Sequence, residues 1–170
     1  MKYLVLSFFL FIVSIGCVNL NSGFEDKDVS FPCSIVNSTQ IEKLCGINGV
    51  QSIENKVGKF CMYSKEKNGE SEFFMNIIFI PVTGSYYNAR NQFIVNNQSI
   101  KSILKENLGL GDSSFLVTNI DKEKNETLQT SLAIFKGNSA FTVIVNNNIC
   151  ADKISEIGQI VLDKLKKNKK

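Results

Sequence analysis

The hydrophobic pattern of this chain begins with a single short apolar run. Residues 4–15 are apolar apart from Ser7 and Ser14, and Lys2 precedes them. A helix needs about 20 apolar residues to cross ~30 Å of hydrocarbon, so this run is too short to span a membrane. A positive residue, a short apolar run and a following small residue are typical of a secretory signal. We therefore predict that residues 1–16 are a signal peptide.

Helical patterns are predicted at both ends of the remaining chain. Thr39 and Glu42 have the spacing of a capping box, and Gly46 is a natural helix end. Near the C-terminus, apolar residues recur every three or four positions over 152–167, as on one face of an amphipathic helix. The residues of this stripe are Ile154, Ile157, Gly158, Val161, Leu162 and Leu165.

The middle of the chain carries strand and turn patterns. Asn68-Gly69 predicts a tight hairpin between strands at 59–64 and 71–82, because both residues tolerate positive φ. The run at 71–82 is apolar in both phases, so we expect a central strand that is covered on both faces. Apolar residues at helical spacing predict helices over 84–93 and 100–108. Alternating residues predict three further strands, at 114–120, 127–136 and 140–146.

This order of elements predicts an α+β fold. We expect an antiparallel sheet of about five strands, in the order α-β-β-α-β-β-β-α, with helices packed mainly on one face. Residues 31–170 would form a single domain, which is long enough for a proper core. Residues 17–30 are mostly polar and lack a periodic pattern, so they are expected to be a flexible tether.

The cysteines bear on both export and stability, and they are Cys17, Cys33, Cys45, Cys61 and Cys150. Without Cys17, four remain, which in an oxidising compartment allows two disulfides. Four cysteines permit three pairings. A zinc site made of four thiolates is the alternative, but no two of these cysteines have the C-x-x-C spacing that such sites favour.

Cys17 itself has a separate expected role. The segment Ser14-Ile15-Gly16-Cys17 resembles a bacterial lipobox, in which the cysteine is acylated and becomes the new N-terminus. Two or more acyl chains would hold a domain stably at a membrane. Ser14 and Gly16 also suit ordinary signal-peptidase cleavage, which would leave Cys17 as a plain thiol and the protein secreted. The even number of other cysteines favours the lipid anchor, so we expect a location in the cell envelope.

The composition argues against several classes of function. The chain has no histidine, which removes the commonest general base and metal ligand. A formal net charge of +3 is too small to indicate nucleic-acid binding. We expect no enzymatic activity, no cofactor and no metal. The lysines at 164–170 are expected to be a solvated helix end, with weak attraction to anionic lipid as the alternative.

Two further features are candidates for binding. Arg90 is the only arginine and lies beside Tyr86 and Tyr87 on a predicted helix, so these residues are either a contact site or an ordinary exposed surface. The glycine-rich segment 109–112 lacks phosphate-loop spacing. We expect it to be a tight turn in which Asp112 bonds local backbone amides.

Three short motifs together resemble those of a known group of proteins. They are Pro32-Cys33-Ser34-Ile35, Cys61-Met62-Tyr63 and the LGLGDSSF segment at 108–115. The chain resembles small bacterial envelope lipoprotein domains of unknown function, in which a CSLL opening, a C-T-W/Y strand and a GLGD-x-A-[FY] turn follow one another. The resemblance implies a Cys33–Cys61 disulfide, which would leave Cys45 to pair with Cys150. It brings no catalytic residues.

We therefore expect a non-enzymatic lipoprotein domain, anchored to the membrane through Cys17, that binds another envelope component. Two alternatives stay open. The many phenylalanines suggest a carrier of a small apolar ligand, held between sheet and helices. Small disulfide-bonded domains can also act as inhibitors of extracellular hydrolases.

Overall fold

The computed structural model describes residues 32–57, 59–81, 91, 101–121, 123–137 and 139–167. The leader, Cys17 and the predicted tether lie outside these residues, as does most of the helix predicted over 84–93. The described elements are α1 (Pro32–Ile35), α2 (Ser38–Cys45), β1 (Val50–Asn55), β2 (Phe60–Lys67), β3 (Glu70–Pro81), β4 (Lys101–Glu106), β5 (Ser113–Ile120), β6 (Thr127–Lys136), β7 (Ser139–Asn146), the 3₁₀ turn η1 (Ala151–Lys153) and α4 (Ile154–Lys167).

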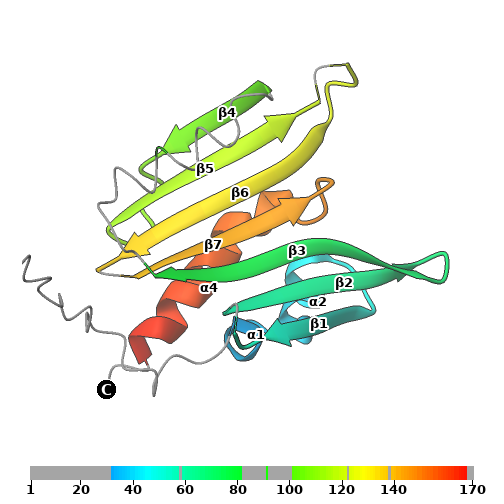
Figure 1. Cartoon of the computed structure of the whole chain (residues 1–170), viewed down its shortest axis with the longest axis horizontal. Helices are drawn as coiled ribbons and strands as arrows, with labels where there is room; N and C mark the ends of the chain where they lie inside the picture. The colour runs from blue at the N-terminus through cyan, green and yellow to red at the C-terminus, as the bar shows by residue number, and fades with distance from the viewer. Residues whose placement is uncertain are drawn as a thin grey trace, which may run out of the picture.

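All seven strands belong to one antiparallel sheet. Their order is β1-β2-β3-β7-β6-β5-β4, so two runs of consecutive strands meet where β3 pairs with β7 (Figure 1). The register at this junction places Ile77 opposite Val143, and Val143 opposite Leu132 of β6. The fold is therefore a single continuous sheet in which β1 and β4 are the edge strands.

The predicted fold class was wrong. The described part of the chain is mostly β, with seven strands and a few short helices, instead of about five strands with a layer of helices on one face. Two strands account for the difference. β1 has no alternating pattern, because all of its side chains except Val50 are exposed. Residues 101–106 form β4 instead of the predicted helix over 100–108, since pairing with β5 overrides a helical spacing based on a few apolar residues.

Two local predictions that rested on particular turn and cap residues were confirmed, and a third was wrong in its position. Asn68 and Gly69 have φ of 55° and 83° and form the predicted hairpin turn. Helix α2 ends at Gly46, which is left-handed with φ of 64°, as expected. The capping box is formed by Asn37 and Gln40 instead of the predicted pair two residues further on, so the start of α2 was misplaced.

The main core lies between one face of the sheet and α4. In Figure 1, α4 crosses behind β6 and β7, and α1 and α2 lie on the same side against β1 and β2. Ile157 and Val161 of α4 are fully buried. Between them, Gly158 lets the helix approach β6 closely, because a Cβ at this position would lie 2.7 Å from Ile134 Cδ1.

A smaller buried cluster lies on the opposite side of the sheet. It comprises Phe115, Val117, Ala133, Phe135 and Ala140. The rings of Phe115 and Phe135 stack with their centroids 5.8 Å apart. Strand β6 is thus buried on both faces from residue 130 to 135, and it is this strand, and not β3, that has the fully covered central position.

Candidate binding surface

Two disulfides fasten the N-terminal part of the domain. Cys33 of α1 is bonded to Cys61 of β2, with their Cα atoms 5.1 Å apart. Cys45, at the end of α2, is bonded to Cys150, which follows β7, at a Cα separation of 4.9 Å. These are the pairs that the resemblance implied. Two disulfides in one domain indicate an oxidising compartment, extracellular or periplasmic.

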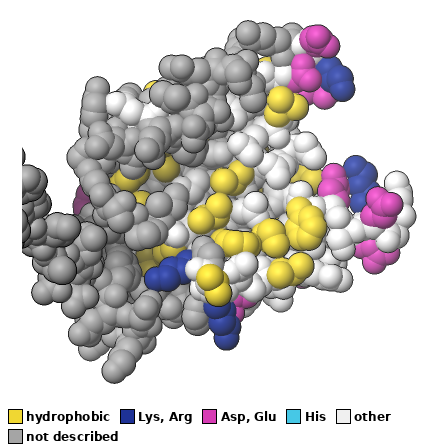
Figure 2. All heavy atoms as spheres, viewed as in Figure 1, with side chains coloured by type: hydrophobic (Ala, Val, Ile, Leu, Met, Phe, Trp, Pro, Cys, Tyr) yellow, Lys and Arg dark blue, Asp and Glu magenta, His cyan; other side chains and the backbone are white. Residues whose placement is uncertain are grey.

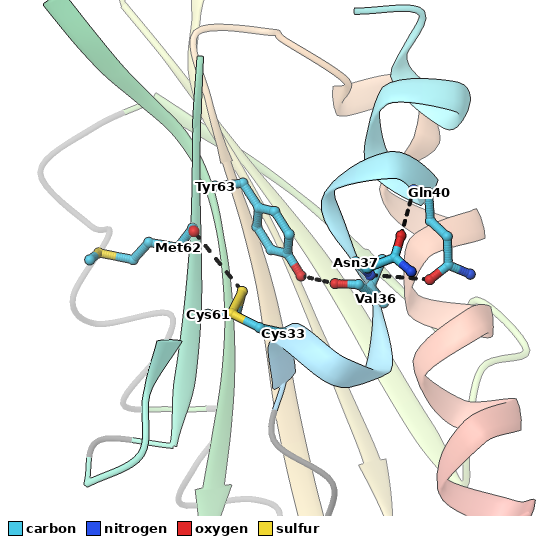
Figure 3. Close-up of a disulfide and its surroundings, with 7 residues drawn as sticks. All are labelled: Cys33, Val36, Asn37, Gln40, Cys61, Met62 and Tyr63. Atoms are coloured by element: carbon cyan, nitrogen blue, oxygen red, sulfur yellow. Dashed lines mark hydrogen bonds between the residues drawn. A yellow bond between two sulfur atoms is a disulfide. The ribbon is translucent and has the colours of Figure 1, made fainter. Parts of the chain in front are cut away.

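Tyr63 adds a third fastening beside the first disulfide. Its ring is fully buried, and its hydroxyl donates a hydrogen bond to the Val36 carbonyl just after α1 (Figure 3). Burial raises the pKa of this phenol well above its usual range, because the charged form would lose its hydration. Since Tyr63 and Cys61 project from the same face of β2, both hold α1 against the sheet.

The opposite face of β1, β2 and β3 carries an apolar patch, which we call the apolar band. Ile53 is 49% exposed and Phe73 is 45% exposed. Four other apolar residues on this face are half-buried, namely Phe60, Met62, Ile78 and Ile144. The register sets Ile53 opposite Met62, Met62 opposite Asn76, and Asn76 opposite Ile144. Figure 2 shows hydrophobic side chains running across this face of the sheet.

Asn76 is the polar member of that row. Its Oδ1 atom is buried and has no hydrogen-bond partner within the described part of the chain. A buried acceptor without a donor costs about 1–3 kcal/mol. The centre of the apolar band therefore contains one polar atom that its own neighbours do not satisfy.

A row of amides borders the band on the same face. Gln129 Nε2 donates to Asn146 Oδ1 at 3.2 Å, and Asn119 Nδ2 approaches Gln129 Oε1 at 3.5 Å. This row crosses β5, β6 and β7. An exposed apolar patch next to polar residues is the usual appearance of an interaction site.

The glycine-rich turn at 109–112 is a structural element. A Cβ on Gly111 would lie 2.4 Å from the Phe135 carbonyl oxygen, so the turn packs directly on the end of β6. The Asp112 carboxylate bonds Lys136 Nζ and the Gly137 N–H, the latter at 2.8 Å. These two hydrogen bonds lower the pKa of Asp112, that of Lys136 contributing most. The prediction that Asp112 bonds local amides was wrong, because its partners are 24 and 25 residues away.

The other predicted site residues are not brought together by the described structure. Cys17, Tyr86, Tyr87 and Arg90 lie outside the described residues. Within the described ranges, no group of three or more His, Cys, Asp or Glu side chains could hold a metal ion. No helix in that same part of the chain is long and apolar enough to cross a bilayer.

Comparison with protein-family models, curated proteins and solved structures gives no significant match for this chain. The resemblance to envelope lipoprotein domains therefore stays a prediction that rests on the three motifs.

Sequence reasoning missed the apolar band. Ile53 lies in a strand that was not predicted, and Phe73 lies in a strand that was expected to be covered on both faces. A β-bulge between Tyr63 and Ser64 shifts the register with β3. Because of this bulge, Phe74 turns into the core while Phe73 stays exposed. The adjacent phenylalanines at 73 and 74 were the only sign of the apolar band in the sequence.

Proposed function

We propose that this chain is a membrane-anchored lipoprotein of the cell envelope whose domain binds another envelope component without catalysing a reaction. The observation that carries the binding role is the apolar band. Ile53 and Phe73 are large, about half exposed and on the same face of the sheet, while most large apolar side chains among the described residues are buried. Burying such side chains is favourable, by ~25 cal/mol per Å² of apolar surface.

The leader and the disulfides support the anchoring role. The lipobox-like segment ends at Cys17, and the first described helix begins at Pro32. The 15 residues from Cys17 to Phe31 can span at most roughly 50 Å when fully extended. An acylated Cys17 would thus keep the domain close to the membrane. The two disulfides agree with a position outside the cytoplasm.

The absence of catalysis is part of the proposal. It rests on the lack of histidine in the whole sequence, which rules out Ser-His and Cys-His dyads. The carboxylates with lowered pKa values, Asp112 and Asp121, lie at the surface, where each accepts hydrogen bonds from turn residues. Such carboxylates are typical of solvated surface and not of a general acid or base in a cleft.

The binding role is tested by removing the apolar band. The variant Ile53→Ser with Phe73→Ser should fold normally, since both side chains are half exposed. Leu128→Ser is the matched control, because Leu128 is 41% exposed but projects to the other side of the sheet from its neighbour Gln129. Membranes from producing cells would be solubilised in mild detergent and the size of the protein's native assembly measured.

We expect the wild-type and control proteins in an assembly larger than one chain, and the double variant at the size of a single chain. Equal sizes for all three proteins would contradict the proposed binding role of the band.

A further inference from the structure

We propose that two copies of this chain pair through the outer edge of β1, so that their two sheets continue into one antiparallel sheet. The two β1 strands would run antiparallel about a two-fold axis at Ile53. This inference goes beyond the proposed function, because it names a second copy of the chain as a partner. It also uses the edge of the sheet instead of its apolar face.

The backbone groups that β1 presents at this edge are those of Ser52 and Glu54. The Val50 N–H is bonded to Glu42 Oε1 at 2.9 Å, so it points away from β2. In an antiparallel pair, the backbone groups of successive residues point alternately towards the partner strand and away from it. The N–H and C=O groups of Ser52 and Glu54 therefore also point away from β2.

The pairing on the other side of β2 gives the same assignment. The Lys59 carbonyl, just before β2, accepts the Phe79 N–H from β3 at 2.9 Å. The odd-numbered residues that follow in β2 therefore bond to β3, and the even-numbered ones bond to β1. Met62 is thus bonded to Ile53, its partner in the register. Since Ile53 bonds inward, its two neighbours in β1 bond outward.

The edge of β1 is open within the described part of the chain. β1 is the outermost strand, and Figure 1 shows no strand beyond it. No backbone group of another described element bonds to Ser52 or Glu54. Their side chains project to the face on which α1 and α2 lie, opposite Tyr63 and Cys61, yet both are exposed. The helices therefore stop short of the edge, and a second chain can approach β1 without displacing them.

β1 lacks the features that keep an exposed edge from pairing. Natural edge strands are commonly protected by lysines, prolines or bulges. The other edge strand, β4, contains Lys101 and Lys105 among its six residues. β1 contains neither lysine nor proline, and it pairs with β2 in an unbroken register. Its backbone groups are therefore available to another strand.

One register of two antiparallel β1 strands uses all of the outward backbone groups. An axis at Ser52 would set Glu54 opposite Val50, whose N–H is already bonded to Glu42. An axis at Glu54 would set two carboxylates opposite each other. An axis at Ile53 sets Ser52 opposite Glu54 on both sides of the axis, and each of these two pairs can form two hydrogen bonds. The structure therefore selects the axis at Ile53.

The side chains in this register favour a second copy as the occupant of the edge. On the open face, Ile53 meets Ile53 of the second copy in a pair without mutual hydrogen bonds, in which the Cα atoms approach to about 4.5 Å. Ile53 is 49% exposed in the single chain, so this pairing covers apolar surface. On the other face, Glu54 meets the uncharged Ser52. The edge of β1 is thus complementary to itself, and the apolar bands of the two copies would join at Ile53.

The test uses the purified mature chain with Cys17→Ser, which cannot be acylated, with both disulfides formed. Analytical ultracentrifugation over a series of concentrations measures its dimerisation. Two matched variants change one exposed residue that projects away from the apolar band. Ser52→Glu sets a carboxylate opposite Glu54 of the second copy, and Ser52→Lys sets an ammonium group there.

We expect the parent chain to form a dimer as its concentration rises. Ser52→Glu should dimerise about 10-fold more weakly, because like charges face each other on both sides of the axis, and Ser52→Lys at least as tightly as the parent. The difference between the two variants should narrow at high salt. A parent that stays monomeric, or equal weakening by both substitutions, would overturn the inference.

Amide hydrogen exchange identifies the surface through which the dimer forms. The Ser52 and Glu54 amides should exchange rapidly in the monomer and be protected in the dimer, whereas the Ile53 amide is bonded to β2 in both. A dimer that leaves the first two amides unprotected would form through another surface, which would also overturn the inference. Because the purified sample contains no other envelope component, the result is independent of the proposed binding role.

Discussion

At the scale of single residues, Tyr63 shows how one buried polar group links two elements. Its ring fills the core, while its hydroxyl satisfies the Val36 carbonyl at the end of α1. A phenylalanine would keep the packing and leave this carbonyl without its donor. The tyrosine therefore serves both the sheet and the helix that it holds.

We predict that Tyr63→Phe lowers the free energy of unfolding by about 1–2 kcal/mol at pH 7. The raised pKa of the folded-state phenol gives a second expectation. Its stabilising effect is complete below the unfolded-state pKa of about 10 and is lost as the pH rises towards the folded-state pKa. Wild-type stability should therefore fall above pH 10 more steeply than that of the variant. Urea unfolding between pH 7 and 11 measures both effects, and parallel curves would contradict the role of Tyr63.

Two glycines of the same turn offer a matched comparison. Gly109 and Gly111 both have positive φ, of 74° and 66°. A Cβ on Gly109 meets nothing within 4 Å, whereas one on Gly111 would meet the Phe135 carbonyl oxygen at 2.4 Å. We predict that Gly109→Ala lowers the free energy of unfolding by about 1–2 kcal/mol, from backbone strain alone. Gly111→Ala should cost clearly more, because β6 must move. Thermal unfolding of the two variants measures this difference. Equal losses of stability in both would contradict the packing of the turn on β6.

At the scale of elements, the disulfides differ in the chain length that they close. Cys33 and Cys61 are 28 residues apart, and Cys45 and Cys150 are 105 apart. In the chain-entropy model, disulfides that close such loops raise the free energy of unfolding by about 3.6 and about 4.8 kcal/mol. Replacing each pair by alanines should therefore cost more for Cys45–Cys150, by about 1 kcal/mol. Urea unfolding of the two double variants measures this difference. The reverse order would show that contacts near α1 outweigh loop entropy.

The sequence predicted those elements whose residues decide their own conformation. Asn68-Gly69 forces a hairpin, and the stripe from Ile154 to Leu165 is long enough to define a helix. Prediction from the sequence failed for β1 and β4, which are edge strands with mostly exposed side chains. Their conformation is set by pairing with β2 and β5, which is a long-range effect without a local pattern.

The candidate surface was harder to predict than the fold for the same reason. The apolar band depends on the face of the sheet to which Phe73 projects. The β-bulge in the pairing of β2 with β3 determines that face. The cysteine pairs followed from a motif resemblance, because neither spacing nor count could choose among three pairings. The cysteine pairs could therefore be predicted from short motifs, whereas a surface assembled from three strands could not be predicted from the sequence.

At the scale of the whole molecule, the domain has two distinct ends and one open apolar face. The end where β1 and β3 finish brings together the start of α1, the β1–β2 turn and the finish of α4 (Figure 1). The apolar band lies between the two ends, on the face of the sheet away from α4.

The anchor itself is the central claim, and the intact mass of the mature protein from native membranes tests it most directly. We predict a chain that begins at Cys17 with diacylglyceryl and acyl groups attached, in which four cysteines react with alkylating reagent only after reduction. A mass without lipid in the soluble fraction, with an odd free thiol, would contradict the anchored domain and indicate a secreted protein instead.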